Sequence, residues 1–234
     1  LRRNMTSPDT LSGPDLAAGI ARDELADHAG ILGHVGQDRV LLVRSDGEFF
    51  AIEPTCPHYG GPLIEGLVGG GTIRCPWHHA CFDLRTGEAL RAPAFDPLRR
   101  WKVSIRGDLV LVDARQEPAP GIRRTGPVSD HRTAMVIVGG GAAGLSAAEM
   151  LRRRGFDGRI VMLSDDDAPP VDRPNLSKDY LAGGVSEESA YLRPATFYSD
   201  NSIDLRLSTE VTALAIRAHE LTVSTGERIA YDRL

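Results

Sequence analysis

Apolar residues follow two different patterns along this chain, and the change between them lies within residues 113–133. From about residue 15 to residue 114 the apolar residues stand in short runs that glycine, proline and aspartate interrupt, which is typical of a compact all-β domain. Turn-forming residues at 45–48 and 106–108 separate neighbouring runs and predict hairpins. The runs that predict strands are 40–43, 49–52, 71–74, 101–105 and 109–112.

The second part of the chain has the pattern of an α/β domain. Residues 113–133 carry proline, glycine and charge with almost no apolar periodicity, as an exposed connector does. An apolar run at 135–138 then leads into glycines, a stretch of helical period at 142–154 and a second apolar run at 159–163. We therefore expect a multidomain chain, with an all-β domain at 15–114, a linker at 115–132 and an α/β Rossmann-like domain at 133–234.

Two short segments in the first domain each place a cysteine beside a histidine. Cys56 precedes His58 by two positions, and Cys75 precedes His78 by three. Each segment can give its thiolate to one iron and its imidazole to the other iron of a [2Fe-2S] cluster, which is the Rieske arrangement. The four side chains could also hold zinc, although zinc fingers usually pair Cys with Cys and His with His, or they could merely pack in a core. The first interpretation predicts one-electron transfer.

Net charge and cysteine content restrict the binding partners and the cellular compartment that we expect. A net charge of −5 argues against a surface for nucleic acid or for an anionic membrane. No apolar run approaches the roughly 18 residues that cross a bilayer, and the first residues lack the apolar centre of a signal peptide. Once Cys56 and Cys75 are assigned to iron, Cys81 has no partner for an internal disulfide and is expected to be a small buried residue. We expect a cytoplasmic protein without nucleic-acid or membrane partners.

A glycine motif opens the second domain. Gly139, Gly141 and Gly144 form Gly-x-Gly-x-x-Gly between a predicted strand and a predicted helix. In that context the glycines allow a tight turn, a close approach of pyrophosphate to the backbone, and close packing of helix and strand. Asp165, with Asp166 as the alternative, stands at the end of the second strand, where an acidic residue holds a ribose hydroxyl. The motif therefore predicts dinucleotide binding, although three glycines could also serve packing alone.

The segment that follows indicates which dinucleotide it is. Residues 171–178, Val-Asp-Arg-Pro-Asn-Leu-Ser-Lys, resemble the Tyr-Asp-Arg-Pro-Pro-Leu-Ser-Lys signature of ferredoxin-reductase-like flavoproteins, with departures at Val171 and Asn175. The resemblance implies that Arg173 and Lys178 lie beside a flavin; without it they would be ordinary loop charges. It also implies that the backbone of Val211 touches the adenine of FAD, although Val211 could equally be a strand residue in the core.

Together the two domains resemble the apoptosis-inducing-factor-like oxidoreductases that carry an N-terminal Rieske domain. The resemblance covers about residues 15–234 and implies a [2Fe-2S] cluster, FAD, and NAD(P)H as the electron donor. Its NAD-binding domain is not in this chain, and the α/β domain is incomplete, because members of the family continue with an Ala-Thr-Gly turn beyond the position of Leu234. We expect a fragment that belongs to a longer electron-transfer enzyme, without an assigned catalytic residue.

Three alternatives for function differ in what they require. In the first, hydride from NAD(P)H reduces FAD, and electrons pass singly to the cluster or to a carrier such as a ferredoxin or an oxygenase component. A Rieske oxygenase would need a further iron held by two His and a carboxylate, and the remaining histidines are scattered. A Rieske ferredoxin with a vestigial flavin half would bind no FAD. The scattered histidines are His28, His34, His79, His131 and His219.

Two residues that follow Cys75 predict the reduction potential of the cluster. High-potential Rieske proteins have a Ser five residues and a Tyr seven residues after the second cysteine ligand, and here these positions hold Ala80 and Phe82. Without the two hydroxyl donors the potential should lie near the bottom of the Rieske range, at about −150 mV. Trp77 is expected to shield the cluster, and residues 92–94 resemble the proline loop that covers it.

Overall fold

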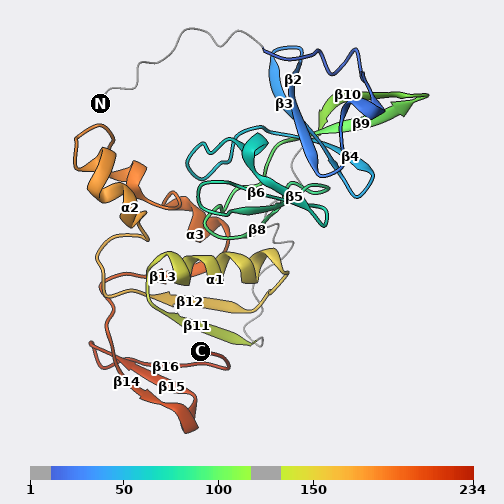
Figure 1. Ribbon diagram of the computed structural model, residues 1–234. Coiled ribbons are helices and arrows are strands. Elements are labelled where there is room, and N and C mark those ends of the chain that lie inside the picture. The colour runs from blue at the N-terminus through green and yellow to red at the C-terminus, as the bar shows by residue number, and fades with distance from the viewer. Residues whose placement is uncertain (1–11, 117–132) are drawn as a thin grey trace. The chain divides into compact units, whose positions relative to one another are not determined.

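The computed structural model describes residues 12–116 and 133–234 (Figure 1). The chain divides into two compact units, one within residues 1–120 and the other within residues 121–234. Most of the predicted linker lies outside the described residues. Its first two residues, Arg115 and Gln116, belong instead to the last strand of the first unit, so the strand predicted at 109–112 continues four residues further than expected.

The first unit is built on a six-stranded antiparallel sheet whose strands lie in the order β1-β10-β9-β4-β3-β2. Both predicted hairpins are present, with left-handed backbone at Asp46 and Gly47 in one turn and at Gly107 in the other. The strands are β1 (Ile20–Ala21), β2 (Ala29–Val35), β3 (Asp38–Ser45), β4 (Glu48–Ile52), β9 (Arg100–Arg106) and β10 (Leu109–Gln116).

A smaller antiparallel sheet, in the order β5-β6-β7-β8, completes the first unit. Its strands are β5 (Leu67–Gly69), β6 (Thr72–Arg74), β7 (Cys81–Asp83) and β8 (Ala89–Arg91), and two short 3₁₀ turns, η1 (Arg22–Glu24) and η2 (Leu63–Glu65), lie in the connections. All four strands have three residues each, which is too short to show an alternation of apolar and polar positions, and only β6 lies within a run that was predicted.

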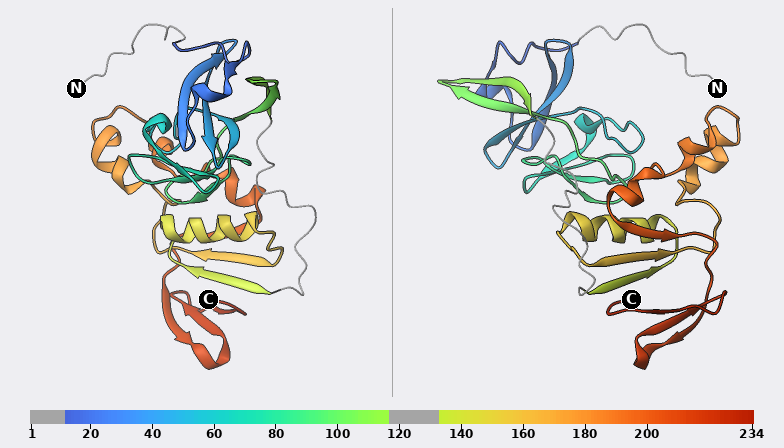
Figure 2. Two further views of the ribbon diagram at one scale, coloured as in Figure 1. Left: turned by 45° about the vertical axis from the view of Figure 1, so that its right-hand side comes forward. Right: turned by 180° about the vertical axis from the view of Figure 1, so that it is seen from behind.

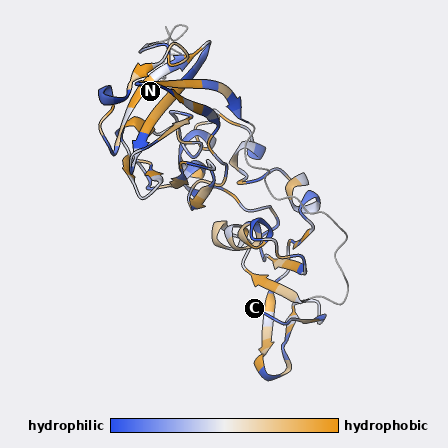
Figure 3. Cartoon of the chain, turned by 90° about the vertical axis from the view of Figure 1, so that its right-hand side faces the viewer, coloured by the Kyte–Doolittle hydropathy of each residue, from blue (hydrophilic) through white to orange (hydrophobic). Residues whose placement is uncertain are grey.

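The continuous apolar run in β3 reflects burial on both faces of the large sheet. Leu41 and Val43 pack into one core cluster, which also holds Cys56 and Cys75, and Val40 and Leu42 pack into a second cluster on the opposite face. Successive strand residues point to opposite faces, so a strand covered on both faces has no polar positions. Figure 3 shows the resulting apolar stretches along the strands of this unit.

Strand β2 was missed because two glycines interrupt its apolar residues. A Cβ atom at Gly33 would lie 2.5 Å from the carbonyl oxygen of Pro14, and one at Gly30 would lie 2.9 Å from a methyl carbon of Leu41. Both glycines therefore mark close approaches of neighbouring chain to the strand, not a break in it.

The second unit begins with the predicted βαβ arrangement. Strands β11 (Ala134–Val138), β12 (Arg159–Leu163) and β13 (Ile203–Arg206) form a parallel sheet in sequence order, and helix α1 (Ala142–Arg153) covers one face. On the other face lies an antiparallel sheet of β14 (Val211–Ala215), β15 (Glu220–Val223) and β16 (Arg228–Ala230), joined by a turn η5 (Ile216–Ala218) (Figure 2). A core cluster that includes Val136, Val161, Leu221 and Val223 joins the two sheets.

A long crossover between β12 and β13 carries only short helical pieces. These are α2 (Arg173–Asn175), the π-type turn η3 (Leu176–Tyr180), which is interrupted by non-helical backbone at Lys178, η4 (Glu187–Ala190) and α3 (Thr196–Asp200). No helix within residues 12–116 and 133–234 combines the length and the apolarity that are needed to cross a membrane.

Candidate functional site

The two cysteine-histidine segments fold into loops of the same shape. In the first loop, the N–H of Cys56 donates to the carbonyl of Gly61 at 2.9 Å, and the carbonyl of Cys56 accepts from the N–H of Gly60 at 2.9 Å. In the second loop, Cys75 makes the corresponding bonds with Ala80 and His79, at 2.9 Å and 3.1 Å. Gly60 and His79, four residues after each cysteine, both have positive φ. Each cysteine is therefore fixed at the start of an equivalent turn.

These loops bring the four predicted ligands together in two pairs. Cys56 and Cys75 are each 2% exposed, and their thiols lie within hydrogen-bonding reach of each other. The rings of His58 and His78 are 5.0 Å apart between centroids and nearly perpendicular, with an interplanar angle of 88°. Nδ1 of His58 is buried, whereas His78 is exposed. Two buried thiols and two neighbouring imidazoles, one at the surface, form the donor set that a Rieske cluster takes.

A single-ion site would require a different arrangement. In the described parts of the chain, no three His, Cys, Asp or Glu side chains converge on one ion position. A tetrahedral zinc site needs its ligands around one point, whereas each iron of a Rieske cluster takes only two protein ligands. The two pairs fit the two-iron group.

The thiol of Cys56 is difficult to ionise in the protein alone. Burial raises the pKa of Cys56 to about 11, because the thiolate would lose its solvation, and the neighbouring Cys75 adds to this shift. The backbone N–H groups of His58 and Tyr59 act in the opposite direction, because they donate hydrogen bonds to Sγ of Cys56. A thiolate ligand at this position therefore needs a cation beside it, which iron supplies.

The glycine motif of the second unit forms the turn between β11 and α1. Gly139 has a φ of +118°, and its N–H donates to the carbonyl of Leu163 in β12 at 2.8 Å. Gly141 is the N-cap of α1, and a Cβ atom there would meet nothing within 4 Å. At Gly144 a Cβ atom would lie 2.1 Å from the carbonyl oxygen of Gly139. Gly144 therefore serves packing, while Gly141 leaves open space at a helix N-terminus, where an anion binds favourably.

The acidic turn after β12 lies against this glycine turn. A Cβ atom at Gly140 would lie 2.1 Å from Oγ of Ser164, and that hydroxyl accepts a hydrogen bond from the N–H of Asp166 at 3.2 Å. Asp165 follows Ser164 directly and is exposed, as is Asp166. The structure therefore brings the predicted acidic residue and the predicted pyrophosphate turn together, through a contact between Gly140 and Ser164 that the sequence did not indicate.

Two family models match this chain, one in each unit. A model of the Rieske [2Fe-2S] domain matches residues 20–102, and a model of the pyridine nucleotide-disulphide oxidoreductases matches residues 133–234. The chain joins one domain of each family. These families imply a [2Fe-2S] cluster, FAD, and NAD(P)H as electron donor.

Three similar proteins show how far the resemblance extends. Apoptosis-inducing factor 3 of Homo sapiens is 36% identical over 209 residues, which cover 86% of this chain and 34% of that protein. The 5,5'-dehydrodivanillate O-demethylase ferredoxin reductase subunit of Sphingobium sp. is 42% identical over 99 residues, or 42% of this chain and 24% of that one. Putidaredoxin reductase of Pseudomonas putida is 41% identical over 100 residues, covering 43% and 24%. The chain thus spans about a third or less of the length of these relatives.

The structure also describes Cys81, Trp77 and Ala94, for which the sequence carried expectations. Cys81 is buried in β7, as expected. Trp77 lies in the second ligand loop, and its ring lies 3.3 Å from the position of a Cβ atom at Gly61 in the first loop. The side chain is 48% exposed, so it shields this region from water only partly. Ala94 packs in the core cluster that contains both cysteine ligands, and the preceding Ala92–Pro93 peptide bond is cis.

The remaining FAD-binding candidates lie on the crossover and on the antiparallel sheet. Arg173 begins α2, and Lys178 is the kinked residue within η3; both are exposed. Val211 begins β14, pairs with Val223 and packs against the core between the sheets. Its strand position is as predicted, and its contact with adenine stays a prediction.

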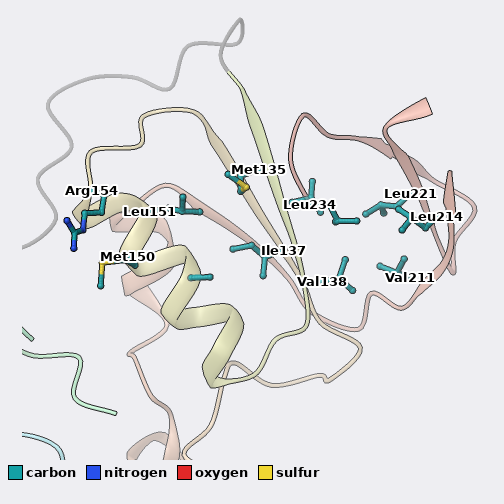
Figure 4. Close-up of a pocket in the computed structure, with 12 residues that line it drawn as sticks. Met135, Ile137, Val138, Met150, Leu151, Arg154, Val211, Leu214, Leu221 and Leu234 are labelled. Carbon is teal, nitrogen blue, oxygen red and sulfur yellow. The ribbon is translucent and has the colours of Figure 1, made fainter. Parts of the chain in front are cut away.

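An apolar cavity of about 780 Å³ lies in the same domain. Residues of β11, α1 and the antiparallel sheet line it, among them Met135, Ile137, Val138, Val211 and Leu214 (Figure 4). Beside it, the N–H of Val136 donates to the carbonyl of Arg233 at 3.0 Å, so the last described residues run parallel to the outer edge of β11.

Gly61 is a residue of the cluster site that the sequence analysis missed. A Cβ atom there would lie 2.6 Å from Sγ of Cys75, so Gly61→Ala would displace the sulfur of a predicted iron ligand. We expect the affinity of the site for its metal to fall at least about tenfold, the scale on which supporting groups act at metal sites, and the iron content of the purified protein to fall with it. Gly69→Ala is the matched control, because a Cβ atom at Gly69 meets nothing within 4 Å. Equal iron and sulfide contents in the two purified variants would contradict the prediction.

Proposed function

We propose that this protein is an electron-transfer oxidoreductase that moves electrons from NAD(P)H through FAD to a Rieske [2Fe-2S] cluster, to an external one-electron carrier, or to both. One observation carries the proposal: a single chain holds two equivalent Cys-His loops with their ligands paired and a glycine turn that leaves open space at the N-terminus of α1. When bound, the flavin supplies the exchange between two-electron and one-electron chemistry.

In this proposal Cys56 and Cys75 hold one iron, and His58 and His78 hold the other. The cysteine side is closed to water, because both thiols lie within the core cluster of the domain. The imidazole side reaches the surface at His78, beside the half-exposed Trp77. The exposed imidazole edge is therefore the place from which an electron would leave or enter.

The second domain supplies the contacts to FAD in the same proposal. The turn of Gly139, Gly141 and Gly144 receives the pyrophosphate, and Asp165 accepts hydrogen bonds from the ribose hydroxyls. Arg173 and Lys178 lie beside the flavin, and the backbone of Val211 contacts the adenine. Support comes from the contact between the glycine turn and the acidic turn and from the open space at Gly141.

The partner that we propose is a one-electron acceptor protein such as a ferredoxin or an oxygenase component. Support comes from relatives whose names describe ferredoxin and putidaredoxin reductases. We further propose a cytoplasmic setting without nucleic-acid or membrane partners. Three cysteines without a disulfide suit a reducing compartment.

Metal analysis, flavin analysis and spectroscopy of the purified protein test the proposal. We expect two irons and two acid-labile sulfides per chain, and a reduced-state EPR spectrum with the low average g value of a centre that has imidazole ligands. We also expect bound FAD and reduction of the cluster by NAD(P)H.

The possible outcomes separate the alternatives. A cluster without FAD would favour a Rieske ferredoxin with a vestigial flavin half, and a colourless protein that holds one zinc would end the electron-transfer proposal.

A further inference from the structure

The loop that carries Arg173 and Lys178 has little packing of its own. Neither α2 nor η3 contains a buried residue, and η3 is broken by the non-helical backbone of Lys178. Segments with few buried apolar contacts open easily, so something outside the two short helices has to fix their place. Contacts made elsewhere in the crossover between β12 and β13 fix these helices in place.

The loop is closed at its base by a short ladder. The N–H of Asp172 donates to the carbonyl of Ala190 at 2.8 Å, and the N–H of Leu192 donates to the carbonyl of Pro170 at 2.9 Å. Ala190 is 1% exposed. The two hydrogen bonds therefore hold both ends of residues 172–190 side by side. The position of this base determines the position of the loop.

A buried ion pair anchors this base to α1. Arg193 follows Leu192 directly. Its guanidinium donates two hydrogen bonds to the carboxylate of Glu149, from Nε at 3.0 Å and from Nη2 at 2.9 Å. The side chain of Glu149 is 4% exposed, and those of Arg193 and Arg153, which also bonds to Glu149, are 13% exposed. The guanidinium of Arg193 also lies 5.1 Å from the ring centre of Phe197.

The same helix holds the far end of the crossover by other means. Arg152, the residue preceding Arg153, donates from Nε to the carbonyl of Asn201 at 2.8 Å and from Nη2 to the carbonyl of Ser202 at 2.7 Å. Helix α1 thus holds the crossover at two places, and the Glu149–Arg193 pair is the one that adjoins the loop base. This is also the helix whose N-terminus Gly141 caps.

We propose that the Glu149–Arg193 ion pair is a clamp that positions the loop, so that Arg173 and Lys178 reach the FAD held at the N-terminus of α1. Both members are positioning residues, and the proposal rests on the proposed function. A bidentate pair fixes the orientation of its partners as well as their distance. Buried ion pairs contribute little net stability compared with apolar packing, so geometry is the property that this pair adds.

Two variants of the full chain test the clamp against one matched control. Glu149→Gln removes the negative charge that binds Arg193. Arg193→Lys keeps the positive charge but cannot form the bidentate hydrogen bonds of a guanidinium. In Glu220→Gln the same chemical change breaks an ion pair on the antiparallel sheet, between the partly buried Glu220 and the exposed Arg228. The measurements are the Kd for FAD, from titration of flavin-free protein well below the melting temperature, and hydrogen exchange along the backbone.

We expect the Kd for FAD to rise at least about tenfold in both clamp variants, which is about the cost of losing one hydrogen bond to a charged group of the ligand. Exchange should become faster in residues 172–190 and stay unchanged in β11 and β12. The control should match the wild type in both measurements. Arg193→Lys keeps the test open if Glu149→Gln does not fold.

The outcomes separate the clamp from the proposed function. A wild type that binds FAD, with a clamp variant that folds, binds FAD equally tightly and keeps the exchange of residues 172–190, would overturn the clamp. A general loss of stability with unchanged FAD affinity would do the same, since it marks a merely structural pair. A wild type that binds no FAD would overturn the proposed function and, with it, the role of the clamp.

Discussion

Gly141→Val is expected to abolish FAD binding and to leave the protein folded. A Cβ atom at Gly141 meets nothing within 4 Å, and the φ of −87° suits a residue with a side chain. The valine would instead fill the space through which a pyrophosphate approaches the N-terminus of α1. Replacing a glycine N-cap with valine, a poor N-cap residue, costs roughly 1 kcal/mol of helix stability. Flavin content, a FAD titration and the melting temperature together measure the effect.

Gly144→Val provides the contrast, because it acts on the fold. Its Cβ atom would lie 2.1 Å from the carbonyl oxygen of Gly139 and 3.3 Å from a methyl carbon of Ile137. Forcing α1 away from β11 should destabilise the domain by about 1–3 kcal/mol or more. We expect a lower melting temperature for the second domain together with loss of FAD, while the iron-sulfur spectrum remains.

Tight FAD binding by Gly141→Val would show that the dinucleotide does not lie at this turn.

The cluster is expected to have a low reduction potential, near −150 mV at the bottom of the Rieske range. Ala80 and Phe82 are both fully buried, and Phe82 packs in the core cluster that contains Cys56 and Cys75. The carbonyl of Ala80 accepts the N–H of Cys75, so Ala80 lies at the base of the second ligand loop. Hydrogen bonds to cluster and ligand sulfurs would stabilise the reduced state, and neither side chain can donate one.

Ala80→Ser combined with Phe82→Tyr should therefore raise the potential by tens of millivolts or more. Both new hydroxyls would be buried, and a buried hydroxyl requires an acceptor, which the sulfurs provide. Phe49→Tyr is the control, because Phe49 packs against the second core cluster on the other face of the large sheet. A redox titration followed by EPR measures the shift. A wild-type potential above about +100 mV, within the same range, would refute the explanation.

The sequence predicted the elements whose signals are local. The strands around 40–43, 49–52 and 101–105, both hairpin turns, and the order of β11, α1 and β12 are confirmed. Each depends on the periodicity or turn chemistry of a few consecutive residues. The polar end of β10 was missed because Arg115 and Gln116 are held by pairing with Trp101 and Arg100 on β9, a contact that local composition does not reveal.

The candidate site likewise divides into residues that local sequence predicts and contacts that only the fold creates. Spacing alone predicted Cys56, His58, Cys75 and His78 as ligands, and the structure brings them together in two pairs. Spacing also predicted the glycine turn, because strand, glycines and helix are consecutive. The supporting contacts could not be predicted in this way. Gly61 lies against Sγ of Cys75, and Gly140 lies against Ser164, only because the chain folds back on itself.

What the sequence by itself determined is therefore the set of chemical groups: two thiols, two imidazoles and a backbone turn at the start of a helix. What only the tertiary structure decided is how that chemistry is held in place. Glu149 and Arg193 stand 44 residues apart and would each pass for surface charge on a helix and on a loop. Burial makes them a pair, because charges removed from water persist only when they are matched and hydrogen-bonded.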